Sequence, residues 1–295
     1  DVCSSDLGTY LSGTNVQLTA NADAGWHFDH WIGHLTGSTN PDSILMDGDK
    51  SVTAVFVQDE YTLTVNVTGN GTVDLDPVGG TYLSGTNVDL TAIADPGWHF
   101  DHWTGHLTGS TNPESILMDG DKAVTAVFVQ DQYTLTVNIT GSGSVDLNPT
   151  GGTYLSGTNV QLTANADAGW QFDHWEGHLA GSTNPESILM DGDKTVTAVF
   201  VQDEYTLTLN VVGNGAVDLD PAGGTYLSGT NVELTANADS GWMFYEWSGH
   251  LTGSTNPANL LMDGDKTVAA TFVPDCNGNG VPDVDDIDGG ASTDF

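Results

Sequence analysis

Arginine is absent from this 295-residue sequence, and its four lysines (Lys50, Lys122, Lys194 and Lys266) occupy one repeated position. Forty Asp and Glu residues give a formal net charge of −36. A surface of that sign repels phosphate backbones and anionic lipid, so nucleic-acid and membrane-surface binding are excluded. Charged residues are nevertheless only 15% of the chain, so most of the surface is expected to be Thr, Asn, Ser and Gly. Such a surface suits a secreted protein, or simply keeps the chain soluble.

Cysteine and long apolar runs are also scarce. Cys3 and Cys276 are too few to cross-link a chain of this length into a disulfide-rich fold. No run of 18 apolar residues exists, so no segment is expected to insert into a membrane. No secretory signal is visible, and both ends look cut, so we expect signal and anchor outside this fragment. Residues 1–7 resemble a translated sequencing adapter and are expected to be artefactual.

Internal repetition is what the chain has in abundance. The segment 97–129 has near-copies that begin at Gly25, Gly169 and Gly241, a spacing of 72 residues. The predicted organisation is an N-terminally truncated repeat, three complete repeats and a truncated tail of different character, with the boundaries 1–58, 59–130, 131–202, 203–274 and 275–295.

The second repeat predicts strands almost throughout. Residues 61–67 alternate apolar and polar side chains, which indicates a strand with one buried face. Asn70-Gly71 is a strong hairpin signal, and few stretches show helical periodicity. The sequence therefore predicts an all-β fold, a tandem array of small antiparallel modules with little or no helix and six to seven strands each, at 61–67, 72–76, 82–83, 87–94, 98–103, 115–118 and 123–129.

The junction between repeats is short. Only residues 129–132 separate Phe128, which ends one core, from Tyr133, which begins the next, and none of them is Gly, Pro or Ser. A link of this kind limits the angles between neighbouring modules. We therefore expect a monomeric, semi-rigid rod.

These residues resemble a known family. YTLTV, a Gly-x-Gly turn, YLSGTNVDLTA, PGWHFDHWTG and DGDKAVTAVF are similar, in order, to the divergent internalin-B-type B-repeats of bacteria over residues 8–273. The resemblance implies a β-rich, β-grasp-related module of surface or secreted proteins, with no catalytic residues. The parent fold has a short helical crossover, whereas residues 87–94 are predicted here as strand.

The tail predicts a calcium loop. Oxygen-bearing side chains occupy positions 1, 3, 5, 9 and 12 of a loop that has Gly280 at position 6, and calcium takes six to eight oxygen ligands on such a turn. The motif resembles thrombospondin type-3 and dockerin loops. The predicted calcium ligands are Asp275, Asn277, Asn279, the Val281 carbonyl, Asp283 and Asp286.

Other polar groups have simpler explanations than ligand binding. His99, His102 and His106 could hold zinc, but the fourth repeat has Met243 and Glu246 at the first two positions, and alternate facing would separate His99 from His102. The third histidine, present in every repeat, is expected to hydrogen-bond the loop after it. The Asp119–Lys122 turn is explained as a hairpin, with a bound cation as the less favoured alternative.

The tryptophans leave two hypotheses open. Trp98 and Trp103 could supply the apolar area that a small module needs, or stack on sugar rings as exposed platforms. Trp103 would share the face of Trp98 only if a bulge intervenes. Core packing is the favoured interpretation.

No catalytic constellation is singled out, because every candidate acid, base or hydroxyl recurs in each repeat. We therefore expect a non-enzymatic, extracellular stalk or adhesive scaffold of a bacterial surface or secreted protein. The alternative is a multivalent array that binds surface glycans or other extracellular proteins.

Overall fold

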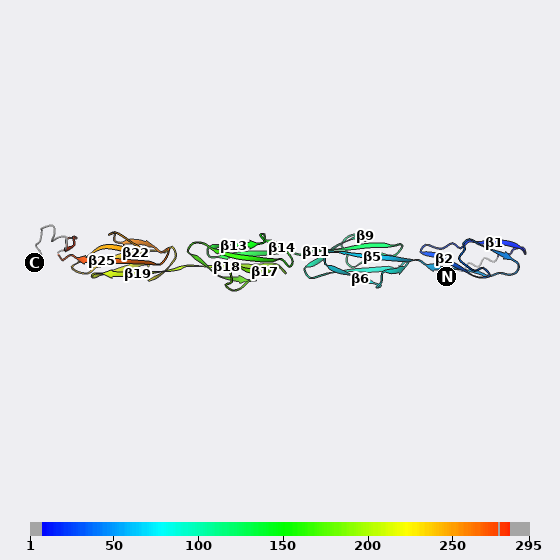
Figure 1. Cartoon of the computed structure of the whole chain (residues 1–295), viewed down its shortest axis with the longest axis horizontal. Helices are drawn as coiled ribbons and strands as arrows, with labels where there is room; N and C mark the ends of the chain where they lie inside the picture. The colour runs from blue at the N-terminus through cyan, green and yellow to red at the C-terminus, as the bar shows by residue number, and fades with distance from the viewer. Residues whose placement is uncertain (1–7, 277, 284–295) are drawn as a thin grey trace. The chain divides into compact units, whose positions relative to one another are not determined.

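The structure is a computed structural model of the whole chain, and it describes residues 8–276 and 278–283. The regular elements in residues 8–276 are all strands (Figure 1). No described segment forms a helix with the length and apolar character needed to cross a bilayer. The predicted all-β fold is therefore confirmed.

The second repeat shows the complete arrangement, and the third and fourth repeats reproduce it. Its seven strands are β5 (Glu60–Thr68), β6 (Gly71–Asp76), β7 (Thr81–Leu83), β8 (Asn87–Ala94), β9 (Trp98–Gly105), β10 (Glu114–Leu117) and β11 (Lys122–Gln130). The third repeat has β12 (Gln132–Thr140), β13 (Gly143–Asn148), β14 (Thr153–Leu155), β15 (Asn159–Ala166), β16 (Trp170–Gly177), β17 (Glu186–Leu189) and β18 (Lys194–Gln202). The fourth has β19 (Glu204–Val212), β20 (Gly215–Asp220), β21 (Thr225–Leu227), β22 (Asn231–Ala238), β23 (Trp242–Gly249), β24 (Ala258–Leu261) and β25 (Lys266–Pro274).

Each complete repeat holds two sheets. In the second repeat a four-stranded sheet has the order β7-β5-β11-β9, and a three-stranded sheet has the order β10-β8-β6. All pairings are antiparallel, as predicted, except that β5 and β11 run parallel, from Leu63 beside Lys122 to Thr68 beside Val127. The same parallel pair recurs as β12–β18 and β19–β25. These sheets are therefore mixed, because the first and last strands of a repeat lie side by side.

The core lies between the two sheets. From the three-stranded sheet, Val88 and Leu90 on β8 are fully buried; from the four-stranded sheet, Val124 and Ala126 on β11 are at most 1% exposed. These residues alternate with more exposed ones along each strand, so a period of two produces the buried face. Leu90 and Val124 belong to one hydrophobic cluster, which Trp103 and Phe128 complete.

The segment 87–94 forms strand β8 rather than the helical crossover that the parent fold implied. Its alternation of Val88, Leu90 and Ala92 with polar residues outweighs the family precedent, as the sequence predicted. β8 is also the central strand of its sheet.

The first repeat is smaller in the described residues. It has β1 (Thr14–Leu18), β2 (Trp26–Gly33), β3 (Asp42–Met46) and β4 (Val52–Gln58), which form two two-stranded sheets, β1-β3 and β2-β4. Strands equivalent to β5 and β6 do not occur within residues 8–58. The contacts that residues make within the chain group it into two compact units, Asp1–Gln132 and Tyr133–Phe295. The finer boundaries between repeats remain a prediction, and residues 1–7, expected to be artefactual, lie outside the described residues.

Candidate functional site

The histidines of β9 share one face of the sheet, which corrects the prediction that His99 and His102 point to opposite faces. His99 pairs with Val129 and His102 with Val127 on β11, and the register shifts between them. The extra residue is Asp101, a β-bulge that resets the alternation. The bulge recurs in β2, β16 and β23, and nothing in a period-two pattern marks it.

Although they share a face, His99 and His102 bind different partners. His99 Nδ1 lies 2.7 Å from Asp131 Oδ1, and His102 Nδ1 lies 2.8 Å from Asp101 Oδ2. The same two pairs occur in the first repeat, at His27–Asp59 and His30–Asp29, both at 2.7 Å. No group of three potential ligands from His, Cys, Asp and Glu converges in the part of the chain that the structure describes. The geometry therefore gives no support to a zinc centre on this face.

The third histidine bonds the strand β11, beyond the loop that it was predicted to bond. The backbone N–H of Ala123 donates to His106 Nδ1 over 3.0 Å, and the backbone N–H of His106 donates to the Ala123 carbonyl over 3.0 Å. His34, His178 and His250 make the same contacts with Ser51, Thr195 and Thr267.

One histidine differs electrostatically from its counterparts. His174 Nδ1 lies 2.7 Å from Asp173 and its Nε2 lies 3.2 Å from Glu176. Hydrogen bonds to Asp173 and then to Glu176 raise the pKa of the His174 imidazole above its ordinary value. The corresponding positions to Glu176 hold Ile32, Thr104 and Ser248, so this pair of carboxylates belongs to the third repeat alone.

Trp103 packs in the core, so the favoured hypothesis for it is confirmed. Its side chain is 1% exposed, its Nε1 donates to the Thr111 carbonyl over 2.9 Å, and its ring centroid lies 4.9 Å from that of Phe100. The bulge at Asp101 is what brings Trp103 to the same side as Phe100. Trp98 is half-buried and packs against the same cluster.

The charged side chains of the Asp119–Lys122 turn bind other groups of the same repeat. Lys122 Nζ forms an ion pair with Asp119, and Asp121 Oδ1 accepts the Thr62 N–H on β5 over 2.8 Å. The hydrogen bond from Lys122, and then its charge, hold the pKa of the Asp119 carboxyl below its ordinary value. Asp121 thus joins this turn to β5, and these contacts favour the hairpin explanation over a cation site.

The tail loop is partly described, because the predicted ligands Asn277 and Asp286 lie outside the described residues. Asp275 is only 7% exposed. Its Oδ1 accepts the N–H groups of Gly278 and Asn279 over 2.8 and 3.2 Å, and its Oδ2 accepts that of Gly280 over 3.0 Å. Asn279 Oδ1 accepts the Val281 N–H, and Asp283 Oδ1 accepts the Cys276 N–H. These bonds wrap the backbone around the first carboxylate of the motif.

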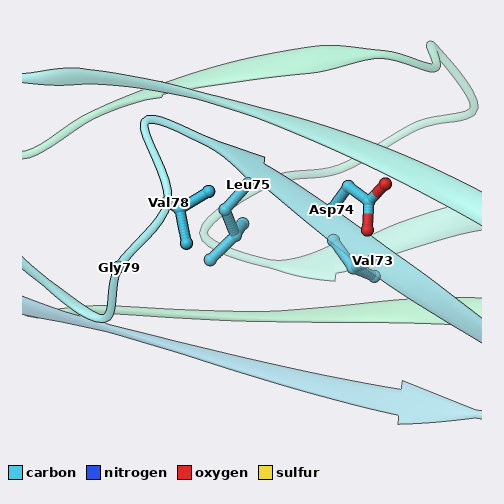
Figure 2. Close-up of a pocket in the computed structure, with 5 residues that line it drawn as sticks. All are labelled: Val73, Asp74, Leu75, Val78 and Gly79. Carbon is cyan, nitrogen blue, oxygen red and sulfur yellow. The ribbon is translucent and has the colours of Figure 1, made fainter.

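A shallow hollow lies beside the turn after β6. Figure 2 shows Val73, Asp74 and Leu75 on the strand and Val78 and Gly79 in the following loop. Val78 is 92% exposed, so the hollow opens directly to solvent. Asp74 is its one titratable lining residue, and the third and fourth repeats have Thr150 and Ala222 where Val78 stands. The carboxylate of Asp74 recurs as Asp146 and Asp218, so among these lining residues it is Val78 that varies between the repeats.

Sequence analysis missed the role of one asparagine. Asn112 Oδ1 accepts the Ala92 N–H and its Nδ2 donates to the Ala92 carbonyl, both over 2.8 Å. The side-chain amide therefore replaces a neighbouring strand at the end of the β8–β10 pairing. Asn40, Asn184 and Asn256 do the same for Ala20, Ala164 and Ala236. Recurrence of an Asn-Pro dipeptide in every repeat was the available signal.

Comparisons with known proteins identify the repeats. No curated protein matches the chain. The Bacillus anthracis TIE protein is similar in structure at 6% identity and a TM-score of 0.39, over 83% of this chain and 57% of that one, so this chain spans little more than half of its length. A TM-score that low does not establish a shared fold. The model of the divergent InlB B-repeat domain matches residues 2–60, 61–132, 133–204 and 205–276. These matches cover nearly the whole sequence, and the chain therefore belongs to the divergent InlB B-repeat family, with four tandem copies of its domain.

Proposed function

We propose that this chain is a non-enzymatic spacer, a stalk or scaffold that holds other parts of a bacterial surface or secreted protein apart. The observation that carries the proposal is the length of the junctions. A single residue separates the last strand of one repeat from the first strand of the next, at Asp59, Asp131 and Asp203. Such a connection gives neighbouring modules little freedom to reorient.

The distribution of polar groups supports a structural role. The imidazole of His106 and the carboxylates of Asp119 and Asp121 hold backbone or side-chain groups of their own repeat. They recur in every repeat, whereas a catalytic site is usually single. An extracellular location follows from the proposal and agrees with the acidic, lysine-poor surface.

Small-angle scattering of the full chain tests the spacer proposal. We expect a rod-like profile with a maximum dimension that does not change with ionic strength above about 0.1 M, where exposed charges are screened. A variant with a Gly-Ser-Gly-Ser insertion after Asp203 is the matched control, and its profile should shift toward that of a flexible chain. A flexible-chain profile from the unaltered protein would overturn the proposal.

The alternative, a multivalent array for glycans or surface proteins, would use the tryptophans as platforms. Burial of Trp103 supports the spacer, and Trp26, at 43% exposure, is the indole most open to a ligand. Titration of the full chain with a bacterial surface polysaccharide separates the two. A saturable change in Trp fluorescence that Trp26→Ala reduces, and that the same change at Trp98, Trp170 and Trp242 reduces further, would favour the array.

We further propose that the tail binds calcium through Asp275, Asn279, Asp283 and the Val281 carbonyl, together with Asn277 and Asp286. The support comes from the buried Asp275 carboxylate and the three N–H groups that converge on it. They hold the first ligand of the motif on a tight turn at Gly280, and calcium prefers oxygen ligands of this kind.

Calorimetry on the full chain tests this site. We expect calcium to bind with a dissociation constant on the order of micromolar to millimolar, and Asp275→Ala to remove the heat. Asp203→Ala is the matched control, because Asp203 holds the same junction position but is followed by β19. The absence of heat in excess calcium would remove the proposal.

A further inference from the structure

Each compact unit contains one complete junction between consecutive repeats. In the first unit β4 ends at Gln58 and β5 begins at Glu60; in the second β18 ends at Gln202 and β19 begins at Glu204. The two junctions can be compared contact by contact, because their residues correspond at the 72-residue spacing.

The junctions are linked by hydrogen bonds that cross from one repeat to the next. Gln58 Nε2 donates to the Ser84 carbonyl of the second repeat over 2.6 Å. The N–H of Asp59 donates to the Gly25 carbonyl over 2.8 Å, and the Asp59 carbonyl accepts the Ser84 N–H over 2.8 Å. The second unit repeats all three bonds with Gln202, Asp203, Gly169 and Ser228.

Close approach at the junction requires a glycine. A Cβ on Gly25 would lie 2.1 Å from Ser84 Oγ, and one on Gly169 would lie 2.3 Å from Ser228 Oγ. Rotation of the serine Oγ would relieve the shorter contact, but the Cβ atoms of Ser84 and Ser228 would still lie 2.8 and 3.0 Å from the new Cβ, so the serine turn of the next repeat must shift. Gly25 and Gly169 also have a φ of +78°, which L residues rarely adopt.

The fourth repeat ends differently, because a tail of another character succeeds it in place of a further repeat. Gly241 has a φ of +79°, but a Cβ there would meet nothing within 4 Å. Pro274 stands where the earlier repeats have Gln58, Gln130 and Gln202. Proline has no side-chain amide to donate, so the donor is present only where another repeat comes next.

We propose that these residues form a specific interface between consecutive repeats, here called the joint. Through it each repeat binds the next repeat of the same chain. Glycine and glutamine belong to the preceding repeat, and the turn of Ser84 or Ser228 belongs to the following repeat. The joint fixes the angle between the two repeats. This inference rests on the proposed spacer function and assigns its stiffness to named contacts.

Pulsed electron–electron spin resonance on the full chain tests the joint. Spin labels at Thr136→Cys and Thr208→Cys, with Cys3 and Cys276 replaced by Ser, report the distance between equivalent exposed strand positions of the third and fourth repeats. We expect one narrow distance peak. Gly169→Ala and, separately, Gln202→Glu should broaden it at least about twofold, because the first removes the space and the second places an acceptor against the Ser228 carbonyl.

Two further variants separate the joint from simple loss of folding. Gly241→Ala carries the same backbone cost without a neighbour and should leave the peak narrow. Ser228→Gly added to Gly169→Ala removes the atoms that the new Cβ meets, and should narrow the peak again.

The outcomes distinguish the joint from the spacer. A narrow peak that Gly169→Ala and Gln202→Glu both leave unchanged would overturn the joint and leave the spacer standing. A broad peak in the unaltered protein would overturn the joint, and the scattering profile would then decide on the spacer independently.

Discussion

The first and second repeats have nearly identical sequences, but the second has the β5–β6 hairpin and the described residues of the first do not. Residues 9–11 and 81–83 both read Thr-Tyr-Leu, yet only the second set is a strand, β7. β7 pairs with β5, and residues 8–58 contain no strand equivalent to β5. Tyr82 is 7% exposed and Tyr10 is 50% exposed. The tripeptide therefore acquires its structure from a partner strand, and tertiary pairing outweighs local propensity.

The largest expected difference between these repeats is at that tyrosine. Tyr82→Ala should destabilise the second repeat by about 3–5 kcal/mol, as truncation of a buried aromatic side chain does. Tyr82 also donates its hydroxyl to the Pro77 carbonyl over 2.9 Å. Tyr10→Ala, the matched change in the first repeat, should alter stability by no more than about 0.5 kcal/mol. Denaturant titration followed by far-UV circular dichroism measures both, and equal effects would break the comparison.

Substitution of the asparagine that replaces a neighbouring strand should also destabilise the second repeat more than the first. The difference should be smaller than for the tyrosine. Asn112→Ala leaves the N–H and carbonyl of Ala92 without their partner in a half-buried setting, at a cost of about 1–3 kcal/mol. Asn40→Ala removes the same two bonds from Ala20 in an exposed setting, where water can replace them. Its cost should be smaller in the same titration, and the reverse order would contradict the role of burial.

The aspartate–lysine turn should not distinguish the repeats. Lys122 and Lys50 each hold the pKa of their partners, Asp119 and Asp47, below the ordinary value, through a hydrogen bond and then through charge. A lowered pKa means that the stabilisation is present above the unfolded pKa and is lost as pH falls through the folded pKa. Carboxyl NMR titration should show low values for both residues. Lys122→Gln should return only Asp119 toward its ordinary value, and a shift of Asp47 in that variant would contradict the assignment of each shift to its own lysine.

The smallest expected effect concerns the third repeat. Asp173 and Glu176 raise the pKa of His174, so their stabilisation is present below the unfolded pKa and is lost as pH rises through the folded pKa. Glu176→Thr, which installs the residue of the second repeat, should lower the pKa of His174. NMR titration of the ring protons measures it, with Glu186→Gln as a control that lies on another strand. An unchanged value would place the cause elsewhere.

The strands could be predicted from the sequence because the alternation of apolar and polar residues follows the buried and exposed faces of a strand. Val88, Leu90 and Ala92 predicted β8 against the family precedent of a helix, whereas His106 bonds Ala123 on β11 rather than the loop that it was expected to bond. Alternation is the same for parallel and antiparallel partners, so it did not reveal that β5 and β11 run parallel. It also gave no sign of the bulge at Asp101, because one inserted residue changes facing without changing composition. The recurrence of glycine and glutamine at the junctions is visible in the sequence. Which residues they contact can be seen only in the folded structure.

Amide hydrogen exchange on the full chain, with and without a bacterial surface polysaccharide, tests the central claim most directly. If each complete repeat is a closed module with buried indoles, the amides of β11, β18 and β25, which lie inside their sheets, should exchange only through global unfolding and should be unaffected by the polysaccharide. The equivalent strand of the first repeat, β4, pairs with β2 alone in the described residues and should exchange faster. Rapid exchange at β11, or new protection of the neighbouring β9 when the polysaccharide is added, would contradict the closed module and favour a binding array.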